Sequence, residues 1–225
     1  TSNRVLLSMA RRTKEDALAT REALLDAAVC VFGRCGVARS SLAEIAEQAG
    51  LTRGAVYWHF KDKGELFNAM MDRVTLPLEA DLIGHCEGQG DPVVELLDKM
   101  RRAMRTIEHD ALTQNVLEIA TLKVEHVDDM GPVRDRYVAA HRDKLDLMTQ
   151  ALERAAALRH KALPAPARTL AEGYHSLIHG LVFSWLLGRS FPLEQTAVLA
   201  METYLAGAGL MPPLTCASAG AANQG

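Results

Sequence analysis

Long apolar runs are absent from this 225-residue chain, in which no stretch of 18 residues is both uncharged and continuously apolar. A helix needs about 20 apolar residues to cross a bilayer, so the sequence predicts no transmembrane helix. The N-terminal residues also lack the apolar core of a signal peptide. We therefore expect a cytoplasmic protein.

Cysteine is scarce, and its spacing matches no metal-binding motif. The chain contains four cysteines, none of them in a C-x-x-C pair: Cys30, Cys35, Cys86 and Cys216. This pattern favours reduced packing residues over a disulfide framework, with redox sensing as the less favoured alternative.

Motifs of enzymes are also missing. His175 and His179 stand four residues apart, as metal ligands on a helix sometimes do, but no Glu follows His175 as in H-E-x-x-H. The chain has neither a G-x-S-x-G nucleophile elbow nor a phosphate-binding P-loop. We expect no enzyme, no cofactor and no metal.

No charge of one sign dominates, since the net charge is −3 and the isoelectric point about 6.2. The distribution is more informative than the sum. Residues 9–63 hold nine Lys and Arg against seven Asp and Glu, and residues 64–225 hold fifteen against twenty-one. A mildly basic head on an acidic body fits a protein that contacts nucleic acid at one end.

Two short helices with a tight turn between them are predicted in residues 40–63, SSLAEIAEQAGLTRGAVYWHFKDK. Ser41 stands where it caps the first helix, with Glu44 in the capping-box position. Gly50 favours the left-handed backbone that ends a helix, and Thr52 caps the next one. This helix-turn-helix places its second helix in the major groove of DNA.

The second helix carries groups suited to DNA. Arg53 stands near the helix N-terminus, the end that meets base edges, and its guanidinium fits the acceptors of guanine. The candidate DNA-binding residues are Ser41, Thr52, Arg53, Gly54, Ala55, Tyr57, Trp58, His59 and Lys63. For Trp58 and Phe60 we favour an alternative role, as core anchors that hold this helix against its neighbours.

Residues 20–74, with TREALLDAAVCVFGRCGVARSSLAEIAEQAGLTRGAVYWHFKDKGELFNAMMDRV, resemble the N-terminal domain of TetR-family repressors. The opening MARRTKEDALATR and the phrase GAVYWHFKDK resemble the AcrR-like branch, which represses multidrug efflux operons. Beyond residue 74 the resemblance rests on length, helical pattern and short motifs such as EHVDDM and SWLL. It implies a dimer that binds a pseudo-palindromic operator and is released by small lipophilic compounds.

The expected fold is all-α, with about nine helices. Besides the helix-turn-helix, helices are predicted near residues 20–33, 93–109, 111–126, 133–159, 166–187 and 192–208. A further helix is predicted to begin at Lys63, and Pro77 predicts a kink or break in it. The expected organisation is a remnant or disordered segment at 1–8, a DNA-binding domain at 9–74, a ligand-binding and dimerisation domain at 75–210 and a disordered tail at 211–225.

The resemblance also implies a ligand pocket in the body. Candidate lining residues are Met100, Met104, Leu117, Thr121, Ile178, His179, Phe183 and Trp185, with Thr121 and His179 as the polar contacts. Any one of these is more often ordinary core than pocket lining. Small residues of the helix near 166–187, Gly173, Ser176, Gly180 and Ser184, predict close approach of another helix, and the resemblance implies a dimer interface there.

Other functional classes stay open at this stage. A ligand-independent architectural DNA-binding protein would show little preference for a palindromic site. An enzyme or interaction bundle with an incidental helix-turn-helix would keep its activity when Arg53 and Tyr57 are removed. Within the family, a regulator of another pathway or an activator is also compatible with these residues.

Overall fold

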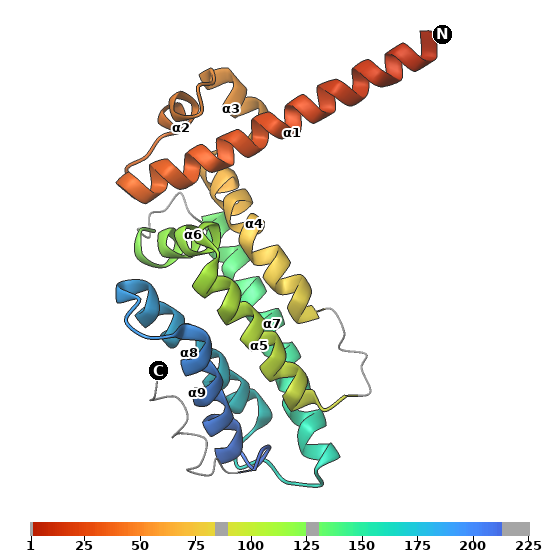
Figure 1. The fold of residues 1–225 in the computed structure, drawn as a ribbon, viewed down its shortest axis with the longest axis vertical. Helices are drawn as coiled ribbons and strands as arrows, with labels where there is room; N and C mark the ends of the chain where they lie inside the picture. Colours follow the sequence, from red (N-terminus) through yellow and green to blue (C-terminus); the bar gives the residue numbers. More distant parts are fainter. Residues whose placement is uncertain (1, 84–89, 125–130, 213–225) are drawn as a thin grey trace, which may run out of the picture. The chain divides into compact units, whose positions relative to one another are not determined.

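The computed structural model describes residues 2–83, 90–124 and 131–212, with only the backbone of residues 2–13, 79–83 and 131–137. These ranges contain nine helices and no strand, which confirms the all-α prediction (Figure 1). The helices are α1 Ser2–Cys35, α2 Leu42–Gln48, α3 Arg53–His59, α4 Lys63–Ile83, α5 Pro92–His109, α6 Ala111–Leu122, α7 Gly131–Leu158, α8 Ala167–Gly188 and α9 Leu193–Gly207. None of the helices in this described part combines the length and apolar character that a bilayer span requires.

The chain divides into two compact units. The first comprises residues 1–77 and 115–136, and the second residues 78–114 and 137–225. The division falls directly after Pro77, three residues beyond the predicted domain boundary between 74 and 75. The head unit, however, also includes residues 115–136, which the sequence assigned to the body.

Helix α1 begins at Ser2, well before the predicted start near residue 20. Residues 2–19 contain no Gly or Pro and are rich in Arg, Lys, Ala and Leu, so nothing in them ends the helix. Its end agrees with the prediction, because Gly36 follows at φ +80°.

The core of the first unit is built from one face of each of its helices. Five residues of α1 are fully buried: Leu24, Leu25, Ala28, Val31 and Phe32. Leu42 and Ile45 of α2, Val56 of α3, and Leu66, Phe67 and Met70 of α4 are buried as well. The rings of Phe32 and Phe67 lie 6.1 Å apart, and Arg73 of α4 pairs with Asp26 of α1 at 2.7 Å.

Helix α4 continues through Pro77 without ending, so the predicted break is absent. Proline removes one backbone donor and crowds the preceding turn, but neighbouring hydrogen bonds can carry a helix past it. Pro77 therefore marks the division between the two units inside a continuous helix.

In the second unit, α9 packs against both α5 and α8. Glu108 of α5 accepts hydrogen bonds from the backbone N–H groups of Leu193 and Glu194, at 3.0 and 2.9 Å, and so caps α9. Gly173 of α8 faces Tyr204 of α9, where an added Cβ would lie 2.4 Å from the tyrosine oxygen. One member of the predicted small-residue stripe thus allows close approach within the chain.

Three predictions fall on residues outside the described ranges. They are the last two residues of the helix predicted at 111–126, the EHVDDM motif at 125–130 and nearly all of the predicted tail. Cys86 and Cys216 lie in these segments.

Candidate nucleic-acid interface and body

Helix α3 is held in place by the two caps and the glycine turn that its sequence predicts. Ser41 accepts from the backbone N–H of Glu44 at 3.2 Å, while Glu44 Oε2 accepts from the backbone N–H of Ser41 at 2.8 Å, which completes the capping box. Gly50 ends α2 at φ +69°. Thr52 Oγ1 then accepts from the backbone N–H of Ala55 at 3.3 Å and caps α3.

The outer face of α3 is open to solvent and polar. Thr52, Arg53 and Gly54 at its N-terminus are exposed, as is Tyr57 one turn later. The guanidinium of Arg53 lies 5.6 Å from the centre of the Tyr57 ring and donates to Tyr57 Oη at 3.5 Å. A Cβ at Gly54 would meet only Thr52 Oγ1, at 3.9 Å, so this position leaves room for a close approach of the helix to another surface.

The two aromatic residues predicted as core anchors behave differently. Phe60 is 1% exposed and the guanidinium of Arg21 lies 5.2 Å from its ring centre, whereas Trp58 is 74% exposed. The prediction is therefore confirmed for Phe60 and wrong for Trp58. Val56 and Phe60 are four residues apart and share the inward face, and Trp58, two residues from each, points to the opposite side.

His59 lies at the edge of the exposed face and is partly buried. Its ring is perpendicular to that of Trp58, with centres 4.6 Å apart. Burial and the nearby positive charge of Arg21 lower the pKa of His59 from its ordinary value. The lowered pKa favours the neutral ring, which offers one donor and one acceptor rather than a charge.

Lys63 supports the loop before α2. Its ammonium donates to the carbonyl oxygens of Ala38 and Ser40, each at 3.0 Å. These two hydrogen bonds use two of the three N–H donors of the ammonium. Lys63 was predicted as a DNA-binding residue, but its hydrogen bonds to the loop at residues 36–41 were not predicted.

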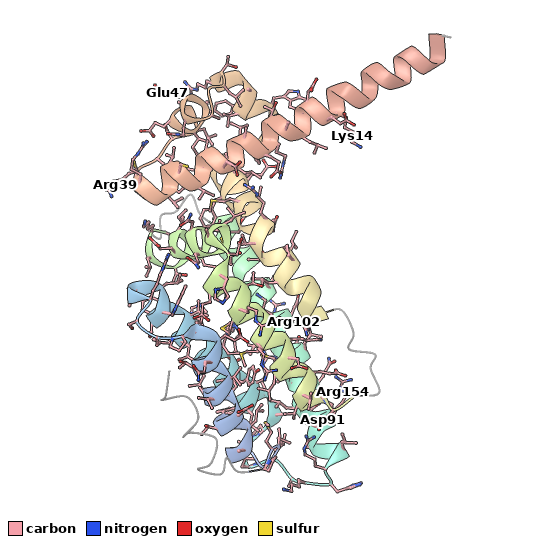
Figure 2. All side chains as sticks on the ribbon, in the orientation of Figure 1. Lys14, Arg39, Glu47, Asp91, Arg102 and Arg154 are labelled. Carbon is pink, nitrogen blue, oxygen red and sulfur yellow. The ribbon has the colours of Figure 1, made fainter. Side chains whose placement is uncertain are left out.

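The exposed basic residues of the first unit that were not among the sequence candidates include Lys14 and Arg39. Lys14 lies on α1 and Arg39 in the loop before α2 (Figure 2). Arg39 Nε donates to the carbonyl oxygen of Cys35 at 3.0 Å, which fixes its stem near the end of α1. The sequence did contain a signal for Arg39, because this basic residue stands two residues before Ser41, the N-cap of α2.

Lys123, directly after α6, is hydrogen-bonded to the end of α1 and to the loop that follows it, within the first unit. Its ammonium donates to the carbonyl oxygen of Gly33 at 2.7 Å and pairs with Glu118 at 2.9 Å. Its own carbonyl oxygen accepts from the backbone N–H of Val37 at 3.2 Å. A hollow of about 280 Å³ lies beside these groups, lined by Val29, Cys30, Gly33, Asn115, Glu118, Ile119 and Lys123.

The eight candidate ligand contacts occupy different environments. Met100, Met104 and Trp185 are buried, Leu117, Thr121 and Ile178 are half-buried, and His179 and Phe183 are exposed. Leu117 and Thr121 belong to the first unit and the other six to the second. Among these described residues, none lines the hollow at α1 and α6 or the hollow described next.

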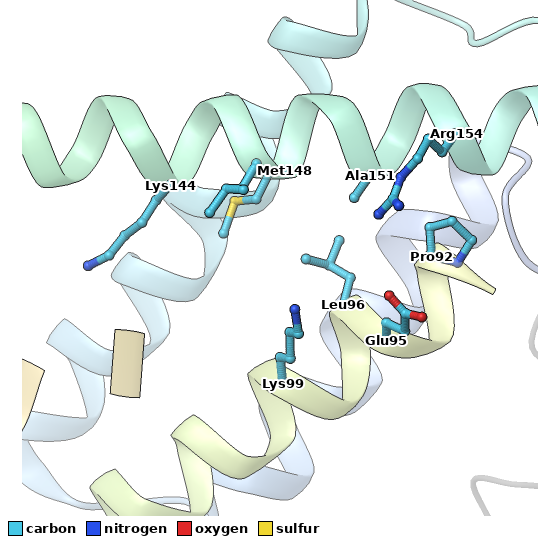
Figure 3. Close-up of a pocket in the computed structure, with 9 residues that line it drawn as sticks. Pro92, Glu95, Leu96, Lys99, Lys144, Met148, Ala151 and Arg154 are labelled. Carbon is cyan, nitrogen blue, oxygen red and sulfur yellow. The ribbon is translucent and has the colours of Figure 1, made fainter. Parts of the chain in front are cut away.

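A second hollow lies between α5 and α7, inside the second unit (Figure 3). The space that the centre of a water molecule can occupy in it is about 40 Å³, and the whole depression, including space open to solvent, measures about 450 Å³. It is lined by Pro92, Glu95, Leu96, Lys99, Lys144, Leu147, Met148, Ala151 and Arg154.

Three histidines meet on α7 and α8. The ring centres of His141 and His175 are 4.6 Å apart, and those of His175 and His179 are 6.1 Å apart. Burial, followed by the neighbouring His141, lowers the pKa of His175 to about 4. Across the described residues, no group of three His, Cys, Asp or Glu side chains has a metal-binding arrangement.

The chain was compared with known proteins and structures. Residues 24–70 match the family described as bacterial regulatory proteins, tetR family. The transcriptional regulator AcrR of Shigella flexneri is 33% identical over 218 residues, which cover 92% of this chain and 99% of that protein.

Solved structures are similar in fold as well as in sequence. One is NalD, the secondary repressor of the MexAB-OprM multidrug efflux pump in Pseudomonas aeruginosa, with a TM-score of 0.77, 32% identity and coverage of 85% of this chain and 96% of NalD. Another is SmeT, repressor of the Stenotrophomonas maltophilia pump SmeDEF, with a TM-score of 0.72, 34% identity and coverage of 89% and 96%. These relatives are transcription regulators rather than enzymes.

Proposed function

Because the chain belongs to the TetR family of bacterial regulatory proteins, we propose that it is a ligand-responsive transcriptional repressor of a multidrug efflux operon. The observation that carries the proposal is the exposed polar face of α3, where Arg53, Tyr57 and Trp58 stand free of the core. A protein that reads a chromosomal operator acts in the cytoplasm.

On DNA, each side chain of this face has a distinct role. Arg53 reads base edges in the major groove, and the small Gly54 and Ala55 let the helix approach. Thr52, Tyr57 and Lys63 contact phosphates and so fix the position of the helix on the duplex. Trp58 adds an apolar surface and one N–H donor beside them.

A second copy of the chain completes the DNA reader. Exposed apolar side chains on α8 and α9 support a two-fold interface: Leu177, Phe183, Leu187 and Leu199. Between them, an added Cβ at Gly180 would meet no atom within 4 Å, and Ser176 and Ser184 are exposed, so a partner helix can approach closely. A two-fold dimer holds its recognition helices about 34 Å apart, one turn of DNA, and so matches a pseudo-palindromic operator.

A small lipophilic compound releases the repressor. The proposal rests on the relatives, since a structure of SmeT with triclosan is 33% identical with a TM-score of 0.75. Helix α4 carries the signal, because it belongs to both units and contains their boundary at Pro77. A ligand that favours one body conformation by about 1–3 kcal/mol lowers operator affinity about 5- to 150-fold.

The test begins with a duplex selected by the purified protein from a random pool. Fluorescence anisotropy then measures binding to this duplex and to a scrambled control, with and without triclosan and other lipophilic drugs. The proposal predicts a palindromic selected site, preference for it over the control and release by at least one drug. Equal binding to both duplexes would contradict the repressor, and binding that no drug reduces would indicate a ligand-independent DNA-binding protein.

A further inference from the structure

The loop between α1 and α2 is held in place by hydrogen bonds from two other parts of the first unit. The ammonium of Lys63 donates to the carbonyl oxygens of Ala38 and Ser40, each at 3.0 Å. The backbone N–H of Val37 donates to the carbonyl oxygen of Lys123 at 3.2 Å, and Ser40 Oγ donates to that of Val37 at 2.7 Å. Val37 and Ser40 are also buried. The backbone of this loop is therefore fixed at several points.

Arg39 is the exposed residue of this fixed loop. Its Nε–H donates to the carbonyl oxygen of Cys35 at 3.0 Å, beside the end of α1 (Figure 2). A guanidinium has five N–H donors, so this bond anchors the side chain and uses only one of them. Within the described part of the chain, no acidic side chain pairs with Arg39. An anchored guanidinium loses little freedom when it binds, which suits it to hold an anion from outside the chain.

The place of Arg39 in the helix-turn-helix indicates which anion it meets. In this motif the first helix crosses the DNA backbone while the second lies in the major groove. Arg39 stands two residues before Ser41, the N-cap of the first helix. When α3 lies in the groove, Arg39 is therefore next to the helix that crosses the phosphates. The planar fork of a guanidinium matches two oxygens of one phosphate and can bind both.

We propose that the loop between α1 and α2 is a second DNA contact, in which Arg39 binds a backbone phosphate beside the groove that α3 occupies. The inference rests on the proposed function and adds a contact that reads no sequence, since phosphates are the same at every base pair. Because Lys63 and Lys123 fix the loop, this contact sets the position of the whole first unit on the duplex. Arg53 remains the residue that reads bases.

The test measures affinity for the selected duplex by fluorescence anisotropy at salt concentrations from about 50 to 200 mM. A phosphate contact releases counterions, so each contact that is lost lowers the slope of log affinity against log salt by about 0.9. We expect Arg39→Gln to lower the slope by this amount. It should weaken binding to the selected and the scrambled duplex equally, by about tenfold at 100 mM salt. Arg39→Lys should keep the slope, because it keeps the charge.

Arg102→Gln is the matched control, since it removes an exposed arginine from the second unit (Figure 2). It should leave the slope unchanged. Circular dichroism checks that each variant is folded. If Arg39 only held the loop through Cys35, Arg39→Gln would weaken binding without changing the slope, and this result would overturn the inference. Equal slopes for Arg39→Gln and Arg102→Gln would overturn it as well.

A second readout uses duplexes in which single phosphates are replaced by neutral methylphosphonates. One such replacement beside the groove should weaken binding of the unaltered protein about tenfold and have little further effect on Arg39→Gln, because the two changes remove the same contact. If Arg39→Gln does not fold, the comparison is made with Arg39→Met. Replacements that weaken the variant as much as the unaltered protein at every position would refute the contact.

The failure of this inference is distinguishable from failure of the proposed function. If the unaltered protein does not prefer its selected duplex, the repressor is refuted and the phosphate contact with it. If the protein prefers that duplex and Arg53→Ala weakens the preference, while Arg39→Gln leaves the slope unchanged, the proposed function stands and only the contact of Arg39 is refuted.

Discussion

Trp58 and Phe60 form a matched pair that separates the folding of α3 from its function. Both are aromatic and lie two residues apart, but Trp58 is 74% exposed and Phe60 is 1% exposed. Replacing each with alanine should therefore produce opposite effects. Phe60→Ala should damage the fold, and Trp58→Ala should damage DNA binding alone.

The burial of each ring sets the magnitude. Truncation of a buried Phe typically costs about 3–5 kcal/mol of unfolding free energy. For a chain of this size each kcal/mol lowers the melting temperature by about 2–4 °C, so Phe60→Ala should lower it by roughly 6–20 °C. Trp58→Ala should change stability by no more than about 0.5 kcal/mol, as exposed substitutions usually do. If the ring contacts DNA, its loss should cost about 1–3 kcal/mol of operator binding.

The assay combines thermal unfolding followed by circular dichroism with operator binding followed by anisotropy, at a temperature where both variants are folded. We expect Trp58→Ala to melt like the unaltered protein and to bind the duplex about 5- to 150-fold more weakly. A large loss of stability in Trp58→Ala, or unchanged DNA binding, would refute the assignment of this face to DNA.

Three further predictions use the same assays. Arg53→Ala should weaken binding to the selected duplex by about 1–3 kcal/mol and relax preference for it over scrambled DNA, with an unchanged melting temperature as the check on folding. Lys123→Met, which removes the hydrogen bond to Gly33, should lower stability by about 1 kcal/mol and weaken drug-induced release; a melting temperature and release curve equal to those of Lys61→Met would contradict this. His175 has a pKa lowered to about 4, so its protonated form is disfavoured in the folded state, and stability should be full above about pH 6.5 and fall by about 1–2 kcal/mol towards pH 4. His175→Asn should flatten that dependence in melts across this pH range, and an unchanged slope would show that His175 is not responsible.

The first unit was largely predictable from its sequence because its signals are local. The capping box at Ser41, the left-handed Gly50 and the N-cap at Thr52 each act within a few residues, and all three formed as expected. The prediction that Trp58 is a core anchor was wrong because α3 has only seven residues. These are too few for an apolar pattern to show which aromatic residue points inward. The exposed fraction of each ring decides this, and it depends on how α3 packs in the folded unit, where it contacts α2.

The body could be predicted as helices but not as a site. The start of α5 was predicted near residue 93, one residue from its observed start at Pro92, whose N-cap is Asp91. The burial of Lys99 could not be predicted, because a lysine on an amphipathic helix is normally a solvated charge and its burial depends on how the helices pack. The eight ligand contacts taken from the resemblance stay a prediction.

The central claim is that the exposed face of α3 reads DNA, and its most direct test is binding of a palindromic duplex selected by the protein itself. Titration by fluorescence anisotropy should show strong preference for that duplex over a scrambled one, with the preference reduced in Arg53→Ala. Equal affinity for both duplexes, or an Arg53→Ala variant that binds and discriminates like the unaltered protein, would contradict the account.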